Sequence, residues 1–455
     1  MMWNPGMPVS ATAGFPARST PWVPMSVGSR RTGGRTMRDL DVYLYGELVA
    51  SLGFSAGGAV SLDYASRDSR SLSLSLPNDG TRLKPATVRN FFDNLLPDSE
   101  PVRARWAAQF SDGRHRVSPK NPFALLEFMG RDVSGALEIV PDGEPQRVSG
   151  DFVRLSATDV ESRLRSVRDD AAAAASFADP DTLAGRFSLA GAESKIALTS
   201  FDGGKTFYSP DGAAPSTHIL KPSGGPYRDG DLIEHVTGRT AALTGLSTAE
   251  STYREFGTVT ALVSTRYDRH SGDDGVLTRV HQEDLCQALG VAPDRKYQDQ
   301  GGPGAGQIAS FLHQFVGEEA ALAFIDAQAF SWAVANTDGH AKNYSILHNP
   351  DGGLQVAPLY DLCSYLPYEP ERGTILPNGR PYTGCALAMR IGRSSEVNAI
   401  GEAGWRSLAD AAGLDQDMVL CRVTEILERV PDAADAAVVE PDLAHVSVLS
   451  RHLSP

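Results

Sequence analysis

Apolar and polar residues alternate with a period of two near the start of the chain. The alternation runs through residues 42–49 and returns in 71–76, where Ser and Leu take turns. This pattern predicts a small antiparallel sheet. Residues 88–96 and 123–128 instead place apolar side chains three or four positions apart, which predicts two helices with one buried face each. The first part of the chain is therefore expected to be a small β-rich unit with helices.

The rest of the chain begins with short strands and continues mainly as helices. A hairpin is predicted through Asp202-Gly203-Gly204, and a strand over 218–221. Apolar spacing then predicts helices over the following ranges: 231–246, 282–289, 306–315 and 318–336. We place a boundary at the alanine run 171–175. The expected units are 37–150, a β-rich lobe at 151–270 and a helix-rich lobe at 271–455.

Residues 1–36 differ in composition from everything that follows. They contain five Pro, five Gly and several Arg, and no acidic residue occurs before Asp39. Such a segment offers little apolar surface to bury. We expect a disordered extension, or an over-long gene prediction whose true start is Met37.

The overall composition limits the classes of protein to which the chain can belong. The 455 residues are 41% hydrophobic and 22% charged, as in a globular protein, and the formal net charge is −14. An acidic chain lacks the general basic field that attracts nucleic acid, so direct binding to DNA is not expected. No apolar run is long enough for a membrane span or a secretory signal, which predicts a cytoplasmic protein without a membrane partner. The four scattered Cys predict free thiols and no structural zinc site.

The densest group of polar residues lies between a predicted helix and a strand at 344–348. In Asn336-Thr-Asp-Gly-His-Ala-Lys-Asn343, Asp338 and Asn343 are five positions apart. Protein kinases use the same separation for an Asp that accepts the substrate proton and an Asn that holds magnesium. Spacing alone is a weak signal. Asp is common in turns, so Asp338 could be an ordinary turn residue.

A second carboxylate follows the same strand. The turn 349–353 contains Pro and Gly and predicts a hairpin with a strand at 354–357, which would return Asp361 to the neighbourhood of Asn343. A carboxylate and an amide oxygen suit Mg²⁺. Considered singly, Asp361 could equally be a helix cap.

We expect the β-rich lobe to supply the positive charge that binds a phosphate group. Lys221 ends the strand 218–221, and Glu234 lies 13 residues later in the next predicted helix, where it could steady the lysine. An ordinary surface ion pair is the alternative for these two residues. The loop 189–195 consists of small residues that let backbone amides approach a phosphate.

Six motifs in order resemble the HipA-type serine/threonine kinases, the toxin components of bacterial toxin–antitoxin pairs. The resemblance spans about residues 38–430, and its motifs are Ser188–Lys195, His218–Lys221, Arg266–Arg269, His281–Gly290, Asn336–Asn343 and Tyr360–Leu362. It implies an α+β, two-lobed protein-kinase-like fold related to phosphoinositide 3-kinases, preceded by a small N-terminal β-rich subdomain.

The resemblance also implies roles for individual residues. Asp338 becomes the catalytic base, with His340 and Asn343 beside it, and Asn343 and Asp361 become the Mg²⁺ ligands. Ser188 matches a serine that family members autophosphorylate, with loss of activity. The residues expected around ATP are Ala190, Gly191, Ala192, Glu193, Ser194 and Lys195 over the phosphates, Lys221 with Glu234, the hinge residues Thr265, Arg266 and Tyr267 at the adenine, and His340, Lys342, Asn343, Tyr360 and Asp361.

The implied function is growth arrest by an ATP- and Mg²⁺-dependent kinase. The expected substrate is an aminoacyl-tRNA synthetase, and the expected partner is a HipB-like DNA-binding antitoxin, through which alone the chain would reach DNA. Two alternatives remain open. One is a catalytically silent nucleotide-binding co-repressor that works with the antitoxin, and the other is a small-molecule kinase, since a fold does not fix the acceptor.

Overall fold

The structure, a computed structural model, describes most of the chain with several gaps. The described residues are 38–55, 59–111, 116–144, 150–169, 195–222, 229–272, 276–369, 372–375, 381 and 383–438. All of them belong to one unit that begins at Met37. The predictions for residues 1–36, for the alanine run 171–175, for Ser188 and for the loop 190–194 lie outside the described residues.

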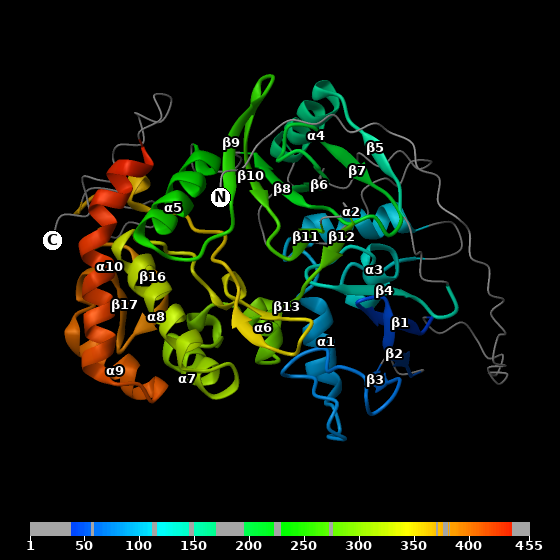
Figure 1. The fold of residues 1–455 in the computed structure, drawn as a ribbon, viewed down its shortest axis with the longest axis horizontal. Helices are drawn as coiled ribbons and strands as arrows, with labels where there is room; N and C mark the ends of the chain where they lie inside the picture. The colour runs from blue at the N-terminus through cyan, green and yellow to red at the C-terminus, as the bar shows by residue number, and fades with distance from the viewer. Residues whose placement is uncertain are drawn as a thin grey trace, which may run out of the picture. The chain divides into compact units, whose positions relative to one another are not determined.

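The N-terminal unit is a four-stranded antiparallel sheet covered by helices (Figure 1). Its strands, in the order β3-β2-β1-β4, are β1 (Leu40–Leu44), β2 (Glu47–Phe54), β3 (Val60–Tyr64) and β4 (Leu137–Pro141). Its helices are α1 (Pro85–Asp93), α2 (Glu100–Phe110) and α3 (Pro122–Met129). Phe91, Phe92 and Phe123 are almost completely buried in its core, as the apolar spacing of 88–96 and 123–128 predicts.

The predicted strand at 71–76 is wrong. This segment forms a turn with an isolated bridge between Ser73 and Leu76, although Leu72 and Leu76 are fully buried. Its polar groups bond to a different part of the chain, because the carboxylate of Glu283 accepts from Ser73 Oγ and from Leu74 N. These long-range hydrogen bonds replace the strand pairing that local alternation suggests.

A second four-stranded antiparallel sheet, in the order β6-β8-β10-β9, forms the β-rich lobe. Its strands are β6 (Ile196–Leu198), β8 (His218–Pro222), β9 (Ser251–Phe256) and β10 (Val259–Thr265), and a separate two-stranded sheet pairs β5 (Phe152–Arg154) with β7 (Tyr208–Pro210). The predicted hairpin through 202–204 is only partly present, because β7 meets the end of β6 at one bridge, Thr199–Tyr208. The helices of this lobe are α4 (Ala157–Asp169) and α5 (Gly230–Thr244).

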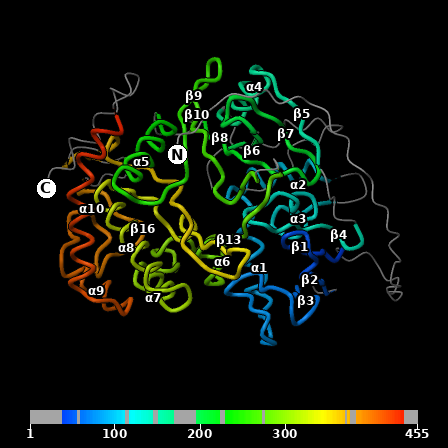
Figure 2. Tube along the Cα trace, viewed as in Figure 1, coloured from blue at the N-terminus to red at the C-terminus, as the bar shows by residue number. Residues whose placement is uncertain are grey.

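Past the hairpin β11 (Arg269–Ser271) and β12 (Leu277–Arg279), a three-stranded sheet begins the helix-rich lobe. It consists of β13 (His281–Asp284), β14 (Ser345–His348) and β15 (Leu354–Val356), and Figure 2 shows the β14–β15 hairpin beside β13. The helix predicted over 282–289 is shorter than expected. Residues up to Asp284 pair with β14, and Asp284 then caps α6 (Leu285–Ala288) through a capping box with Gln287.

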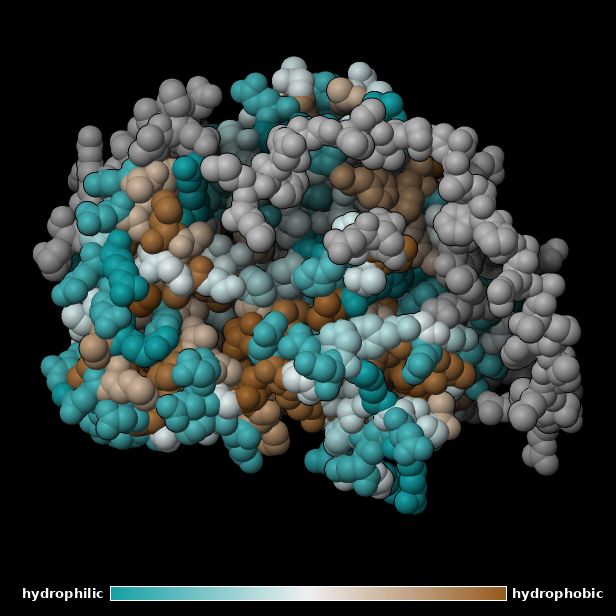
Figure 3. Space-filling view, viewed as in Figure 1, coloured by the Kyte–Doolittle hydropathy of each residue, from teal (hydrophilic) through white to brown (hydrophobic). Residues whose placement is uncertain are grey.

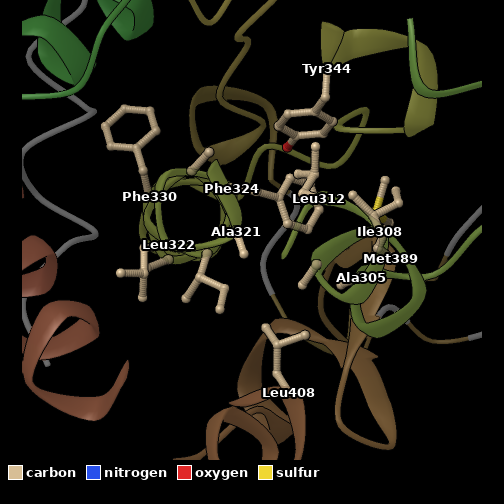
Figure 4. Close-up of a cluster of buried hydrophobic side chains, with 14 of the residues drawn as sticks. Ala305, Ile308, Leu312, Ala321, Leu322, Phe324, Phe330, Tyr344, Met389 and Leu408 are labelled. Atoms are coloured by element: carbon tan, nitrogen blue, oxygen red, sulfur yellow. The ribbon is translucent and has the colours of Figure 1, made fainter. Parts of the chain in front are cut away.

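Helices supply most of the second lobe. They are α7 (Ala305–Phe315), α8 (Glu318–Ala333), α9 (Glu402–Ala412) and α10 (Gln416–Ala437), with a small sheet of β16 (Ala386–Ile391) and β17 (Ser394–Glu396). Their core includes Leu312, Phe324 and Phe330 (Figure 4). On the face in Figure 3, hydrophilic residues cover much of the surface of this lobe. None of the described helices is long and apolar enough to cross a membrane.

Candidate active site

A cavity of about 160 Å³ collects residues from the sheet of the β-rich lobe, the segment after β10, the loop after α8 and the N-terminal unit. Every predicted site residue that the structure describes lines it. These residues are Lys195, Lys221, Glu234, Thr265, Arg266, Tyr267, Asp338, His340, Lys342, Asn343, Tyr360 and Asp361. Residues separated by up to 166 positions are therefore brought to one place.

The loop that carries Asp338 is shaped by the end of α8. Ala335 has a left-handed backbone (φ 49°), and the N–H of Asn336 donates to the carbonyl of Ser331 at 2.8 Å. Gly339 leaves little room for a side chain, since an added Cβ would lie 3.1 Å from the Tyr344 hydroxyl. The loop turns sharply and leaves the Asp338 side chain exposed to the cavity.

Asn343 and Tyr297 both contact Asp338. Asn343 Nδ2 donates to the backbone carbonyl of Asp338 at 2.9 Å, which orients the amide of Asn343. The hydroxyl of Tyr297 donates to the Asp338 carboxylate. Burial and the neighbouring Asp338 raise the pKa of Tyr297, so its phenol stays protonated and acts as the donor.

Lys221, Glu234 and Asp361 form a charged cluster on the other side of the cavity. Lys221 lies on β8 opposite Leu262, and its Nζ is 2.7 Å from Glu234 Oε1 and also contacts Asp361 Oδ1. Burial alone would raise the pKa of Asp361, but the ammonium groups of Lys221 and Lys195 hold it well below its usual range. Asp361 is therefore an anion that faces the cavity at any physiological pH.

The backbone of Asp361 is held in the left-handed region (φ 59°), which Asp and Asn tolerate better than other side chains. His340 is buried beside the ring of Tyr297, with ring centroids 4.8 Å apart. Burial, together with the nearby Lys296, lowers the pKa of His340 to about 4. The imidazole is consequently neutral at pH 7, which makes it a hydrogen-bonding group rather than a fixed charge.

In the hinge segment after β10, the side chain of Arg266 has a structural role. Its guanidinium donates to Asp268, to Ser216 Oγ at 2.9 Å and to the carbonyl of Val133 at 3.0 Å, and only 4% of the residue is exposed. The side chain is thus committed to the protein, and the N–H of Arg266 also donates within the protein, to the carbonyl of Thr217 at 2.9 Å. The ring of Tyr267 lies 5.6 Å from that of Tyr360 and forms the adjoining wall.

The donor set suits a divalent cation bound together with phosphates. Asn343 contributes an amide oxygen and Asp361 a carboxylate, and both line the cavity. No cluster of three or more His, Cys, Asp or Glu that could hold a metal occurs among the described residues. Mg²⁺ does not need such a cluster, because it binds through one or two carboxylates, water and substrate phosphates.

Sequence reasoning missed several residues that line the cavity. The most prominent are Tyr297 and Lys296, in the loop before α7, and Asn94 and Asp98, from the N-terminal unit. Asp98 lies more than 190 positions from the two lysines that it contacts, Lys296 and Lys342. No local pattern marks such a residue, and only the folded chain shows it.

The Lys221 cluster allows a direct prediction. Lys221→Met should lower kcat/KM for ATP by about 100-fold, because an uncharged side chain of similar length cannot stabilise phosphate charge. Steady-state kinetics would check this, with Lys205→Met, an exposed lysine in the turn of the same lobe, as the matched control. Equal kinetics for the two variants would show that Lys221 does not meet the phosphates.

Fold and site together define a class of protein. Two lobes meet at a cavity that holds a strand lysine paired with a helix glutamate, a loop with Asp and Asn five residues apart, and a further Asp after a hairpin. These are the parts that kinases use to transfer a phosphoryl group. The comparisons with known proteins agree. A family model described as "HipA-like C-terminal domain" matches residues 187–435, and one described as "HipA N-terminal domain" matches residues 40–140.

Relatives extend this match over nearly the whole chain. A Sinorhizobium fredii protein named "Putative kinase Y4mE" is 34% identical over 413 residues, which cover 89% of this chain and 93% of the relative. The serine/threonine-protein kinase toxin HipA of Shewanella oneidensis is 28% identical over 425 residues, 89% of this chain and 90% of the relative. The chain belongs to the HipA-like family of serine/threonine-protein kinases.

A solved structure supports the same fold. The Shewanella oneidensis HipA chain, in a complex with HipB and operator DNA, matches with a TM-score of 0.73 and 25% sequence identity, covering 91% of this chain and 96% of that chain. The expected two-lobed, kinase-like α+β fold with a small N-terminal sheet is thereby confirmed.

Proposed function

We propose that this chain is an ATP- and Mg²⁺-dependent serine/threonine protein kinase that acts as the toxin of a toxin–antitoxin pair. The observation that carries the proposal is the cavity in which the Lys221–Glu234–Asp361 cluster meets the loop of Asp338 and Asn343. A catalytically silent relative would not need to keep both a base and a complete set of metal-binding oxygens.

Each residue has a defined task in the proposed reaction. The hydroxyl oxygen of the acceptor Ser or Thr attacks the γ-phosphorus of ATP, the bond to the β-phosphate oxygen breaks, and ADP leaves. Asp338 orients the acceptor and takes its proton, while Lys221, steadied by Glu234, binds phosphate oxygens. Asn343 and Asp361 would hold Mg²⁺, which would supply positive charge to offset the negative charge of the phosphates.

The hinge and the walls of the cavity would place the base of the nucleotide. Thr265 to Tyr267 would contact the adenine, while the Arg266 side chain would keep the segment rigid through its bonds to the protein. Rigid positioning matters here because catalysis of phosphoryl transfer consists largely of positioning and electrostatic stabilisation.

The proposed partner and the proposed substrate rest on the family resemblance. The Shewanella relative was solved with HipB and its operator DNA, which supports a HipB-like DNA-binding antitoxin as the partner of this chain. With its net charge of −14, the chain would reach DNA through that partner. An aminoacyl-tRNA synthetase is the proposed substrate, on the strength of the family resemblance alone.

The function would be tested in cells that express the wild-type chain or Asp338→Ala. Protein phosphosites, phosphorylated metabolites and antitoxin-dependent repression would be measured in both. We expect a phosphorylated Ser or Thr on an aminoacyl-tRNA synthetase with the wild-type chain only. A phosphorylated metabolite without any new protein phosphosite would favour the small-molecule kinase. No phosphorylation by either chain, with antitoxin-dependent repression intact, would favour the silent co-repressor.

Ser188 leads to a prediction about regulation, although it lies outside the described residues. Autophosphorylation there should add about −1.5 to −2 charges and three acceptor oxygens close to the phosphate loop, and so lower affinity for ATP. Peptide mass spectrometry after incubation with Mg-ATP should find the phosphate on Ser188. Phospho-Ser188 protein that still binds ATP as tightly as the unmodified form would exclude this mechanism.

A further inference from the structure

The N-terminal unit reaches into the catalytic cavity through one carboxylate. Asp98 follows α1 and lies in the short segment before α2. Its Oδ1 is 2.7 Å from the Nζ of Lys342, and its Oδ2 is 2.8 Å from the Nζ of Lys296. The three side chains are between 3% and 14% exposed, so this bridge is largely shielded from water.

Both lysines are tied to the loop that carries Asp338. Lys342 belongs to its short 3₁₀ turn, Ala341–Asn343, and its carbonyl accepts from the Tyr360 hydroxyl at 2.7 Å. The carbonyl of Lys296 accepts from the N–H of Ala341 at 3.3 Å, and the next residue, Tyr297, donates to the Asp338 carboxylate. A carboxylate that fixes both ammonium groups therefore holds the catalytic loop from two sides.

The segment around Asp98 is itself anchored. Asn90 Nδ2 donates to the carbonyl of Gly290 at 2.8 Å, and Asn94 Nδ2 donates to the carbonyl of Val291 at 2.9 Å. These bonds join α1 and the residue that follows it to the loop that leads to Lys296. The N-terminal unit thus forms a rigid support behind the catalytic loop.

Charge explains why this site needs a carboxylate. Lys342 and Lys296 would place two positive charges beside each other in a shielded cavity, which is unfavourable without a counter-ion. Burial would raise the pKa of Asp98, yet the two lysines lower it to about 2. Asp98 is accordingly ionised throughout the physiological range, and the cluster of three keeps a net charge of +1.

We propose that Asp98 is a positioning residue for phosphoryl transfer, through which the N-terminal unit sets the geometry of the catalytic loop by clamping Lys342 and Lys296. The inference rests on the proposed kinase function and adds to it. The N-terminal unit becomes part of the catalytic machinery. A displacement of Asp98 would move Lys342, and with it the neighbouring Asn343, away from the position that transfer requires.

Asp98→Asn tests this clamp, because it removes the charge and keeps the shape. We expect kcat to fall by about 10- to 100-fold, since a misplacement of about 1 Å has effects of that size. KM for ATP should stay the same or fall, because the cavity gains positive charge, and this separates a positioning role from a general loss of structure. Asp98→Glu keeps the charge and should retain more of the kcat than Asp98→Asn.

Asp63→Asn is the matched control. Asp63 is exposed on β3 of the same N-terminal unit, where its carboxylate accepts from Ser61 Oγ at 3.4 Å, and it is not among the residues that line the cavity. Its kcat should stay within about twofold of the wild type, as for an ordinary surface substitution.

Turnover and thermal unfolding, measured on the same preparations, distinguish results that support the clamp from results that overturn it. An unchanged kcat in Asp98→Asn overturns the inference, and so does an equal loss in Asp63→Asn or a loss that comes with a raised KM and a lower unfolding temperature. If Asp98→Asn does not fold, Lys296→Met decides, because it removes one arm of the clamp: a reduced kcat at an unchanged unfolding temperature supports the clamp, and a wild-type kcat overturns it. A wild-type chain without any phosphoryl transfer would refute the proposed kinase function itself.

Discussion

Asp338→Ala is expected to lower kcat for phosphoryl transfer by about 1,000-fold, within the range that removal of a general base produces. The protein should remain folded. Asp338 is exposed at the tip of its loop, and the hydrogen bonds that shape the loop come from backbone groups of Asn336 and Ser331 and from the amide of Asn343. Turnover of radiolabelled ATP and thermal unfolding would be measured on the same preparation.

Asp351→Ala is the control for this variant. Asp351 is an exposed residue in the turn between β14 and β15, close in sequence but not among the residues that line the cavity. It should keep wild-type turnover. A similar turnover in Asp338→Ala would mean that Asp338 does not serve as the base.

Asp361→Asn is expected to lower kcat by at least about 100-fold through loss of a metal-binding carboxylate. Asparagine is preferable to alanine as the replacement, because the residue has a left-handed backbone that Asn tolerates. Higher Mg²⁺ concentrations should restore part of the activity, because a weaker site fills at higher metal concentration. The dependence of kcat on Mg²⁺ would be measured for the variant and the wild type.

The structure also shows what Asp361→Asn would do to its neighbours. Lys221 would lose the carboxylate of Asp361 and keep that of Glu234 at 2.7 Å. The fold should therefore persist, and Asp351→Asn gives the matched control. A variant with unchanged kcat and an unchanged Mg²⁺ dependence would exclude Asp361 as a metal ligand.

Local patterns in the sequence were enough to predict much of this site. The strand that ends at Lys221 and the helix that contains Glu234 follow from apolar spacing, and the pair indeed lies within hydrogen-bonding distance. The Pro- and Gly-containing turn at 349–353 likewise predicts the hairpin that returns the chain to the cavity, where Asp361 and Asn343 both lie. Each of these features depends on residues close together in the sequence.

Features that depend on distant residues could not be predicted in the same way. The alternation at 71–76 suggests a strand, but Glu283 draws Ser73 and Leu74 into a turn. Arg266 stays a predicted neighbour of the adenine, but no local pattern shows that its guanidinium is bound to Asp268, Ser216 and Val133. The clamp formed by Asp98 is another feature of this kind, since its partners lie 198 and 244 positions away.

Transfer of the γ-phosphoryl group of ATP to protein is the central claim, and the most direct measurement uses purified chain and γ-labelled ATP. The wild-type chain with Mg²⁺ should place the label on Ser or Thr of a protein, either an added aminoacyl-tRNA synthetase or the chain itself. Omission of Mg²⁺ or the change Asp338→Ala should abolish the labelling. Protein labelling that persists at the wild-type level in Asp338→Ala, or a wild-type chain that labels no protein, would contradict the account.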